Sequence, residues 1–216
     1  MARAKETRGD DTGILLGMLS AVELDNAVTQ RRLARELGIA LGLANAYLKR
    51  CARKGFIKIR KVPLNRYGYY LTPRGFAEKS RLTTKYLAVS FDFFRTARRD
   101  CTAVMGECRA RGWRRIALYG AGELAEIAVL SAGDAECEVA CVIDGGWGAR
   151  HCAGRPVVAD AASALALAPD LEAVIVTDAA SPQQSFDEAR AAAPTLGLAA
   201  DRVLAPDLLR IAPPAR

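Results

Sequence analysis

The sequence predicts an α/β protein with two folded parts, a basic helical domain and an acidic doubly wound parallel sheet, joined by a long helix. Charge is divided unequally, because residues 1–112 carry 23 Lys and Arg against 10 Asp and Glu, whereas residues 113–216 carry 8 against 14. Strand-like apolar runs alternate with helical patterns only in the acidic part, which is the order of a parallel sheet. We therefore expect domains at residues 1–84 and 113–216 and a connecting helix at residues 85–112.

The basic part begins with the pattern of three helices. Apolar residues recur at helical spacing over residues 14–22. Thr29 is expected to cap a second helix over residues 30–37 that ends at Gly38, and a third helix follows over residues 41–54. Two short helices around a tight turn are typical of a helix-turn-helix.

A β-hairpin is expected next. Residues 56–62 alternate apolar and basic side chains, as a half-exposed strand does. Residues 63–68 are expected to turn the chain and residues 69–71 to return it, after which Thr72 and Pro73 begin another helix. A hairpin directly after a helix-turn-helix predicts a winged helix-turn-helix domain.

The outer face of the third helix is expected to read the edges of DNA bases, while basic side chains around it meet phosphates. Asn45 could pair with an adenine edge, and the small Gly42 and Ala46 would allow a close approach to the groove. The alternative is a solvated basic surface on a winged helix that binds protein. The residues predicted to contact double-stranded DNA are Arg31, Arg32, Gly42, Leu43, Asn45, Ala46, Lys49, Arg50, Lys58, Arg60, Lys61 and Arg66.

Four segments of this part, residues 29–42, 45–50, 54–58 and 70–84, resemble the MarR-type winged-helix regulators associated with exopolysaccharide and lipopolysaccharide gene clusters. The resemblance covers about residues 12–90 and includes the run Leu-Thr-Pro-Arg-Gly at the exit of the hairpin. It implies sequence-specific DNA binding by a dimer. Such regulators are short and usually lack a second domain, so the chain departs from them after about residue 110.

The connecting helix is expected because residues 85–111 contain no proline and only one glycine. Leu87, Phe94, Cys101 and Cys108 repeat every seven residues, which gives a heptad-like seam. This seam could pack on its own domain or pair with a second copy of the chain, and pairing is favoured. A homodimer formed through residues 85–111 would present two recognition helices to a palindromic site.

The acidic part opens with an expected strand at residues 116–119, the glycine turn Gly120-x-Gly122-x-x-Ala125 and a helix at residues 123–131. In a dinucleotide-binding sheet these positions allow the tight turn, the approach of a phosphate and the packing of the helix. Further expected strands lie at residues 138–143, 155–158, 173–177 and 202–204, and helical segments at residues 161–168, 186–193 and 206–211. The ligand is expected at the strand carboxyl ends, against Gly120, Ala121, Gly122, Glu123, Asp144, Thr177 and Asp178.

Residues 118–122, 142–144, 154–158 and 173–178 resemble two kinds of Rossmann-like domain. One stands at the front of sugar acyltransferases of the NeuD/PglD type, and the other is the nucleotide domain of the Rex redox repressors. Both resemblances imply a nucleotide-type effector, a nucleotide sugar or NAD(H). Glu123 favours the helix dipole but repels phosphate, so another small ligand, or a sheet without any ligand, remains open.

An enzyme is not expected, because the sequence contains no Gly-x-Ser-x-Gly, HExxH or Walker motif and the sheet uses nearly all of residues 113–216. His151, the single histidine, is expected in a solvated loop. The alternatives are an enzyme that acts on a nucleotide sugar or uses NAD(P), and an architectural DNA-binding protein without a ligand.

Six cysteines without a C-x-x-C pair predict reduced core thiols and no metal site. We see no signal peptide and no membrane span, so a cytoplasmic protein is expected. The sequence therefore predicts a transcriptional regulator whose C-terminal domain senses a small-molecule effector of the nucleotide type, with polysaccharide genes as candidate targets.

Overall fold

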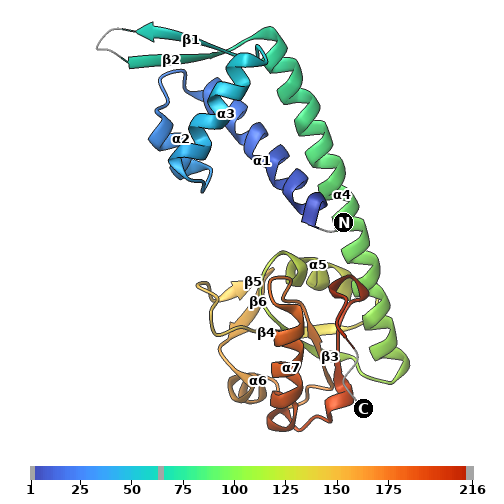
Figure 1. Ribbon diagram of the computed structural model, residues 1–216. Helices are drawn as coiled ribbons and strands as arrows, with labels where there is room; N and C mark the ends of the chain where they lie inside the picture. Colours follow the sequence, from blue (N-terminus) through green and yellow to red (C-terminus); the bar gives the residue numbers. More distant parts are fainter. Residues whose placement is uncertain (1–2, 63–65, 213–216) are drawn as a thin grey trace. The chain divides into compact units, whose positions relative to one another are not determined.

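The computed structural model describes the backbone of residues 3–62 and 66–212, and the side chains of residues 11–61 and 67–212. It divides into two compact units, Met1–Phe91 and Asp92–Arg216. The division falls inside one long helix, α4 (Pro73–Ala110), which contains both the helix expected after the hairpin and the expected connecting helix (Figure 1). The described residues include no helix that is both long enough and apolar enough to span a membrane.

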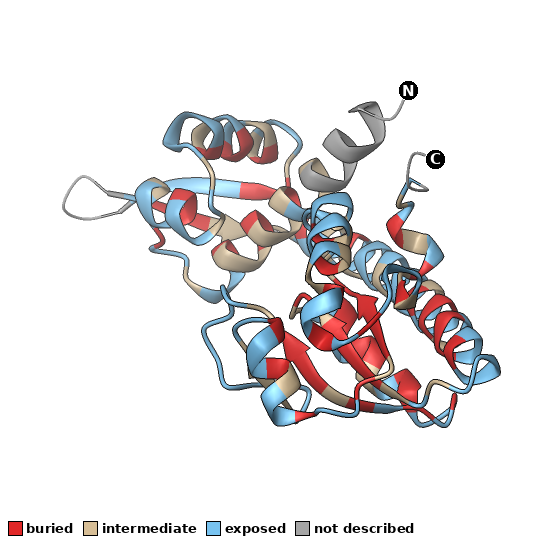
Figure 2. Cartoon of the chain, turned by 90° about the horizontal axis from the view of Figure 1, so that it is seen from below, coloured by how far each residue is buried: buried red, intermediate tan, exposed pale blue. Residues whose placement is uncertain are grey.

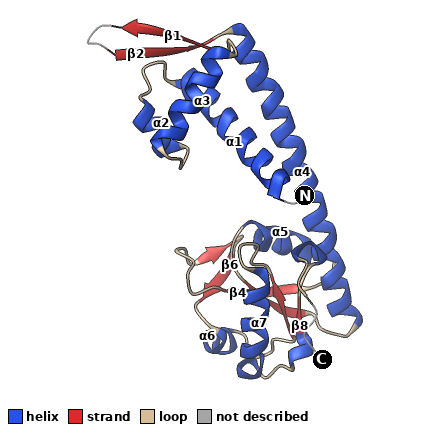
Figure 3. Cartoon of the chain, viewed as in Figure 1, coloured by secondary structure: helices blue, strands red, loops and turns tan. Residues whose placement is uncertain are grey.

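The first unit has the expected helix-turn-helix and hairpin (Figure 3). Thr29 caps the second helix, since its Oγ1 accepts a hydrogen bond from the Arg32 amide at 3.2 Å. Gly38 follows that helix with a φ of +62°, in the left-handed region that glycine favours. The elements are α1 (Arg3–Leu24), α2 (Gln30–Glu36), α3 (Leu41–Arg53), β1 (Ile57–Val62) and β2 (Arg66–Leu71).

The hairpin strands β1 and β2 are antiparallel and pair from Ile57 opposite Leu71 to Val62 opposite Arg66. The return strand therefore begins three residues earlier than expected, and residues 63–65 of the predicted turn lie outside the described residues. Thr72 then caps α4, because its Oγ1 accepts from the Gly75 amide at 3.0 Å. A Cβ at Gly75 would lie 2.0 Å from the carbonyl oxygen of Phe56, so α4 can start here only with glycine at this position.

The second unit is built on a six-stranded sheet in the order β5-β6-β4-β3-β7-β8. Every neighbouring pair is parallel except β5 and β6. The strands are β3 (Arg115–Tyr119), β4 (Glu138–Ile143), β5 (His151–Cys152), β6 (Arg155–Val158), β7 (Ala173–Val176) and β8 (Val203–Leu204). The helical elements are α5 (Glu123–Ala132), α6 (Ala161–Leu167), α7 (Pro182–Ala192) and the short 3-10 turns η1 (Ala193–Leu196), η2 (Ala200–Arg202) and η3 (Asp207–Leu209).

This topology confirms the predicted doubly wound sheet. The chain runs outward from β3 through β4 and β6, then returns to the other side of β3 to form β7 and β8, so strand order reverses between β3 and β7. Two local predictions were wrong. His151 lies exposed in the short edge strand β5, which pairs with β6, and not in a loop. Helix α7 begins at Pro182, four residues before the expected start.

The core of the second unit includes one face of α4. Figure 2 shows the central strands of the sheet as mostly buried, and all four residues of β7 are buried. Ala97, Cys101, Met105 and Cys108 on α4 have no exposed surface and pack in the same core. The C-terminal half of the predicted heptad seam therefore packs on its own domain, so pairing through the whole of residues 85–111 is wrong for that half.

All six cysteines are buried free thiols, as predicted. Burial raises the pKa of Cys51 and Cys141 to about 11, and that of Cys101 and Cys108 to about 12. These thiols stay protonated and pack as small apolar side chains. Among the described residues no group of His, Cys, Asp and Glu could hold a metal ion.

Candidate DNA-binding surface and candidate ligand pocket

Helix α3 is strongly amphipathic. Ala44, Leu48 and Cys51 are buried against the other helices, whereas a stripe at the opposite side is exposed. That stripe is formed by Gly42, Ala46, Lys49 and Arg53, which are spaced by four, three and four residues and so lie on one helical face. Arg53 is not among the residues predicted from the sequence to contact DNA, although its spacing from Lys49 places it on the predicted face.

The edges of this stripe differ from one another. Leu43 is exposed on one edge, beside the stripe. Asn45 on the other edge is half-buried, because it lines a pocket of about 150 Å³ between α3 and the hairpin. Ile59 and Tyr67 of the hairpin line the same pocket. Asn45 therefore lies beside the hairpin and not at the centre of the exposed face.

Two of the predicted DNA-binding arginines already have acidic partners. The Arg50 guanidinium lies 3.2 Å from both carboxylate oxygens of Asp11, which also accepts a hydrogen bond from the Tyr47 hydroxyl. Arg32 pairs with Asp25 at 2.9 Å and with Glu36 at 2.6 Å. These pairs reduce the positive charge that the two arginines can offer to phosphates.

Other predicted cations are exposed and form no ion pair with any described side chain. They are Arg31 at the start of α2, Lys49 on α3, and Lys58, Arg60 and Lys61 on β1. The Arg60 guanidinium also lies 5.8 Å from the centre of the Tyr70 ring, a cation–π distance. Arg66 is in β2, but its side chain lies outside the described ones.

In the second unit, the glycine turn after β3 depends on close backbone contacts. Gly120 has a φ of +97°, and a Cβ there would lie 2.7 Å from the Asp178 amide nitrogen. Thr177 is buried, and its hydroxyl donates to the Gly120 carbonyl oxygen at 2.6 Å. Gly122 has a φ of +138°, and no described atom lies within 4 Å of a Cβ added there, its chain neighbours aside. Gly120 and Thr177 therefore shape the turn, and Gly122 leaves one side of it accessible.

Asp144, at the end of β4, binds the same turn. Its Oδ2 accepts from the Ala121 amide at 2.9 Å, and its Oδ1 accepts from the Gly146 amide at 2.8 Å. In a dinucleotide-binding turn the backbone amides point toward phosphate. Here one of these amides is already bound to a carboxylate, which is a local departure from that pattern.

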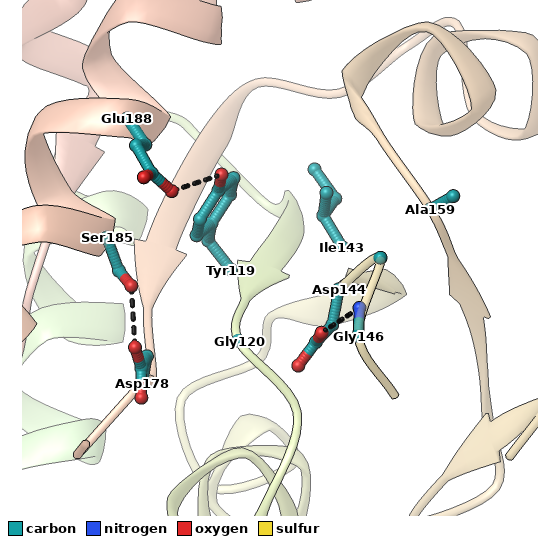
Figure 4. Close-up of a pocket in the computed structure, with 10 residues that line it drawn as sticks. Tyr119, Gly120, Ile143, Asp144, Gly146, Ala159, Asp178, Ser185 and Glu188 are labelled. Carbon is teal, nitrogen blue, oxygen red and sulfur yellow. Dashed lines mark hydrogen bonds between the residues drawn. The ribbon is translucent and has the colours of Figure 1, made fainter. Parts of the chain in front are cut away.

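A pocket of about 320 Å³ lies where the strand order reverses (Figure 4). Its walls come from the carboxyl ends of β3, β4 and β7, from the residue after β6 and from α7. The lining residues are Tyr119, Gly120, Ile143, Asp144, Gly145, Gly146, Ala159, Asp178, Ser185 and Glu188. This lining holds three carboxylates and no lysine or arginine, so the pocket is suited to hydrogen-bond donors and poorly suited to a pyrophosphate.

Polar contacts order the α7 side of this pocket (Figure 4). The Ser185 hydroxyl donates to Asp178 at 2.6 Å, and the Tyr119 hydroxyl donates to Glu188 at 3.4 Å. Burial, followed by the nearby Glu188 carboxylate, raises the pKa of Tyr119, so its hydroxyl remains a donor. The residues predicted to bind the ligand do not include Tyr119, Ser185 or Glu188, which line this pocket. The Ser181-Pro182 pair, typical of a helix start, would have placed the last two on one face of α7.

A second cavity of about 200 Å³ lies against the start of α5 and is lined by Phe93 of α4. The predicted ligand-binding residues divide between the two spaces. Gly120 and Asp144 line the larger pocket, and Asp178 lines both. The remaining four, Ala121, Gly122, Glu123 and Thr177, line the second cavity.

Comparison with protein families supports the N-terminal geometry. A family model described as a winged helix-turn-helix DNA-binding domain matches residues 12–58. The match runs from α1 through α3 to the first strand of the hairpin. No curated protein sequence matches the chain. The first unit is thus a winged helix-turn-helix DNA-binding domain, which confirms that part of the sequence prediction.

Proposed function

We propose that the protein is a transcriptional regulator that binds double-stranded DNA through α3 and the hairpin. The observation that carries this proposal is the exposed, basic and amphipathic α3 within a domain of the DNA-binding winged helix class. The resemblance to regulators of exopolysaccharide and lipopolysaccharide gene clusters makes polysaccharide genes the first targets to test.

The test is a mobility shift with the full chain and the DNA upstream of its own gene, at several salt concentrations. Because binding to phosphates releases counterions, affinity should fall steeply as salt rises. An excess of unrelated duplex should not remove the shifted complex. A chain that binds both duplexes equally would fit a non-specific architectural protein and would contradict the proposal.

We further propose that the second unit binds a small effector in the pocket at the carboxyl ends of β3, β4 and β7. Asp144, Asp178 and Glu188 support a ligand rich in hydroxyl groups, which donate hydrogen bonds to carboxylates. Among nucleotide-type ligands this favours contacts to the sugar portion of a nucleotide sugar, or to the ribose of NAD(H), over contacts to the pyrophosphate.

A thermal-shift panel of UDP-sugars, CMP-sugars, NAD⁺ and NADH tests this proposal. A true ligand at 100 times its dissociation constant should stabilise the second unit by about 2.7 kcal/mol. Replacing Ser185 with alanine should weaken the effect, whereas Ser163→Ala on the exposed start of α6 should leave it unchanged. Absence of any shift across the panel, with the pocket intact, would overturn the nucleotide-type assignment.

We also propose a homodimer, formed through the exposed middle of α4. Large apolar side chains there reach the surface in two stripes, one formed by residues 87, 91 and 94 and the other by residues 86, 89 and 93, and soluble monomers rarely expose large apolar patches. These side chains are Tyr86, Leu87, Val89, Phe91, Phe93 and Phe94, with exposed fractions of 55, 45, 63, 59, 43 and 37%. Light scattering should give twice the mass of one chain. Leu87→Glu should return the monomer mass, while Lys85→Glu, an exposed polar position on the opposite side of the same helix, should not.

A further inference from the structure

The first two turns of α3 present few polar groups to a DNA partner. Leu41 and Leu43 have exposed fractions of 45 and 43%, and Ala46 is exposed as well. Gly42 between the leucines has no side chain and no described atom within 4 Å of an added Cβ. The N-terminal half of the exposed face is therefore apolar and shallow.

The polar side chains near this surface lie further along α3, are half-buried, or already form an ion pair. Lys49 begins the next turn, and Arg53 lies at the end of the helix. Asn45 lines the pocket beside the hairpin, and Arg50 pairs with Asp11. A base edge opposite the start of α3 would consequently meet carbon atoms first.

Recognition helices contact base edges mainly with residues near their N-terminus. The only apolar group that bases display in the major groove is the C5 methyl group of thymine. An apolar and exposed start of α3 gains from burying such a methyl, whereas it leaves the polar edges of guanine and cytosine without partners.

We infer that Leu43 and Ala46 recognise thymine methyl groups, so that the operator half-site has thymines opposite the first two turns of α3. This inference rests on the proposed function, since it requires α3 to enter the major groove. The feature of DNA that α3 recognises is then the methyl group of thymine. The predicted Asn45–adenine contact is not needed for it.

The experiment begins with binding sites selected from a random duplex pool by the full chain. Each thymine of a selected half-site is then replaced, one at a time, by deoxyuridine paired with adenine. This change removes one methyl group and retains every hydrogen-bonding group of the base pair. Affinity should fall about fourfold for each contacted methyl, the loss expected from exposing one buried methyl-sized group.

Protein variants then assign each methyl group to a side chain. Leu43→Ala should remove the sensitivity to deoxyuridine at one thymine and retain it at the thymine opposite Ala46. Lys49→Ala is the matched control on the same helix, and it should weaken binding to the thymine and deoxyuridine duplexes by the same factor. Circular dichroism should show that both variants keep the helical content of the parent chain.

Two outcomes separate this inference from the proposed function. If the chain selects a site but no deoxyuridine substitution changes affinity, methyl recognition is wrong although the protein is a sequence-specific regulator. The same conclusion follows if the sensitivity at every thymine survives in Leu43→Ala and also in Ala46→Gly. If no site is selected at all, the proposed function itself fails.

Discussion

The exposed face of α3 and the glycine turn after β3 both carry polar groups, but these groups differ in what they already bind. On α3, Lys49 and Arg53 project from an exposed stripe. At the glycine turn, Asp144 accepts two backbone amides and Thr177 donates to the Gly120 carbonyl. A partner of α3 therefore meets available groups, whereas a ligand at the turn must bind beside existing hydrogen bonds or replace them.

The largest expected effect concerns the packing that holds the first unit together. Gly75→Ala would place a Cβ 2.0 Å from the Phe56 carbonyl oxygen, so the start of α4 must move away from the hairpin. We expect a loss of about 3 kcal/mol or more in the free energy of unfolding, measured with urea, together with loss of DNA binding.

Gly106→Ala is the matched control on the same helix, because nothing lies within 4 Å of an added Cβ there. It should stabilise the second unit by about 0.5–1 kcal/mol through helix propensity. Equal destabilisation by both changes would contradict the close contact at Gly75.

The second prediction concerns the contribution of the Asp144 carboxylate to the stability of the glycine turn. Asp144→Asn replaces one acceptor oxygen with an amide donor, which then faces the Ala121 or Gly146 amide. We expect a loss of about 1–2 kcal/mol in unfolding free energy. Asp134→Asn is the control, since Asp134 forms an exposed pair with Arg98 and its replacement should cost well under about 1 kcal/mol. An unchanged stability of Asp144→Asn would leave this carboxylate free for a ligand.

A third prediction compares available and paired cations on the DNA-binding surface. Lys49→Ala should lower DNA affinity about five- to tenfold at moderate salt and reduce the salt slope by about 0.9, the value for one lost phosphate contact. Arg32→Ala should lower affinity about twofold or less, because Arg32 already pairs with Asp25 and Glu36. Equal losses would show that DNA displaces those carboxylates from Arg32.

Much of the fold could be predicted because its signals are local. Thr29 and Gly38 mark the helix boundaries of the helix-turn-helix, and the alternation of strands and helices gives the sheet its order. Both parts of α4 were predicted, but as two helices, although no proline follows Pro73 and no glycine lies between Gly75 and Gly106 within it. The two-residue strand β5 is too short for any periodicity, so it could not be predicted.

The chemistry of the two surfaces was less accessible from sequence, because it depends on contacts between distant residues. Asp11 and Arg50 are 39 positions apart, and nothing in their local pattern indicates that they pair. Asp144 was expected to contact the ligand, but the backbone geometry of the turn brings the Ala121 amide within 2.9 Å of its carboxylate. Periodicity gives the face on which a side chain lies and leaves its hydrogen-bond partner undetermined.

The smallest expected effect concerns Asp11. Because Asp11 forms an ion pair with Arg50, Arg50 is less available to phosphates than the exposed cations without an acidic partner. The Tyr47 hydroxyl, and then Arg50, hold the pKa of Asp11 below its ordinary value. A carboxyl with a depressed pKa in the folded state stabilises that state above its unfolded pKa, about 4, and loses this contribution as pH falls through the folded pKa. Because the pair is about 40% exposed on both sides, we expect no more than about 1 kcal/mol at neutral pH.

Asp11→Asn should therefore lower the unfolding free energy slightly at pH 7, with the difference from the parent chain vanishing well below pH 4. The same change should tighten DNA binding at neutral pH about two- to threefold, because Arg50 becomes available to phosphate. Arg50→Ala added to Asp11→Asn should cancel that gain. If Asp11→Asn leaves DNA affinity unchanged while stability falls, Arg50 lies away from the DNA, and its pair with Asp11 serves only to hold α1 against α3.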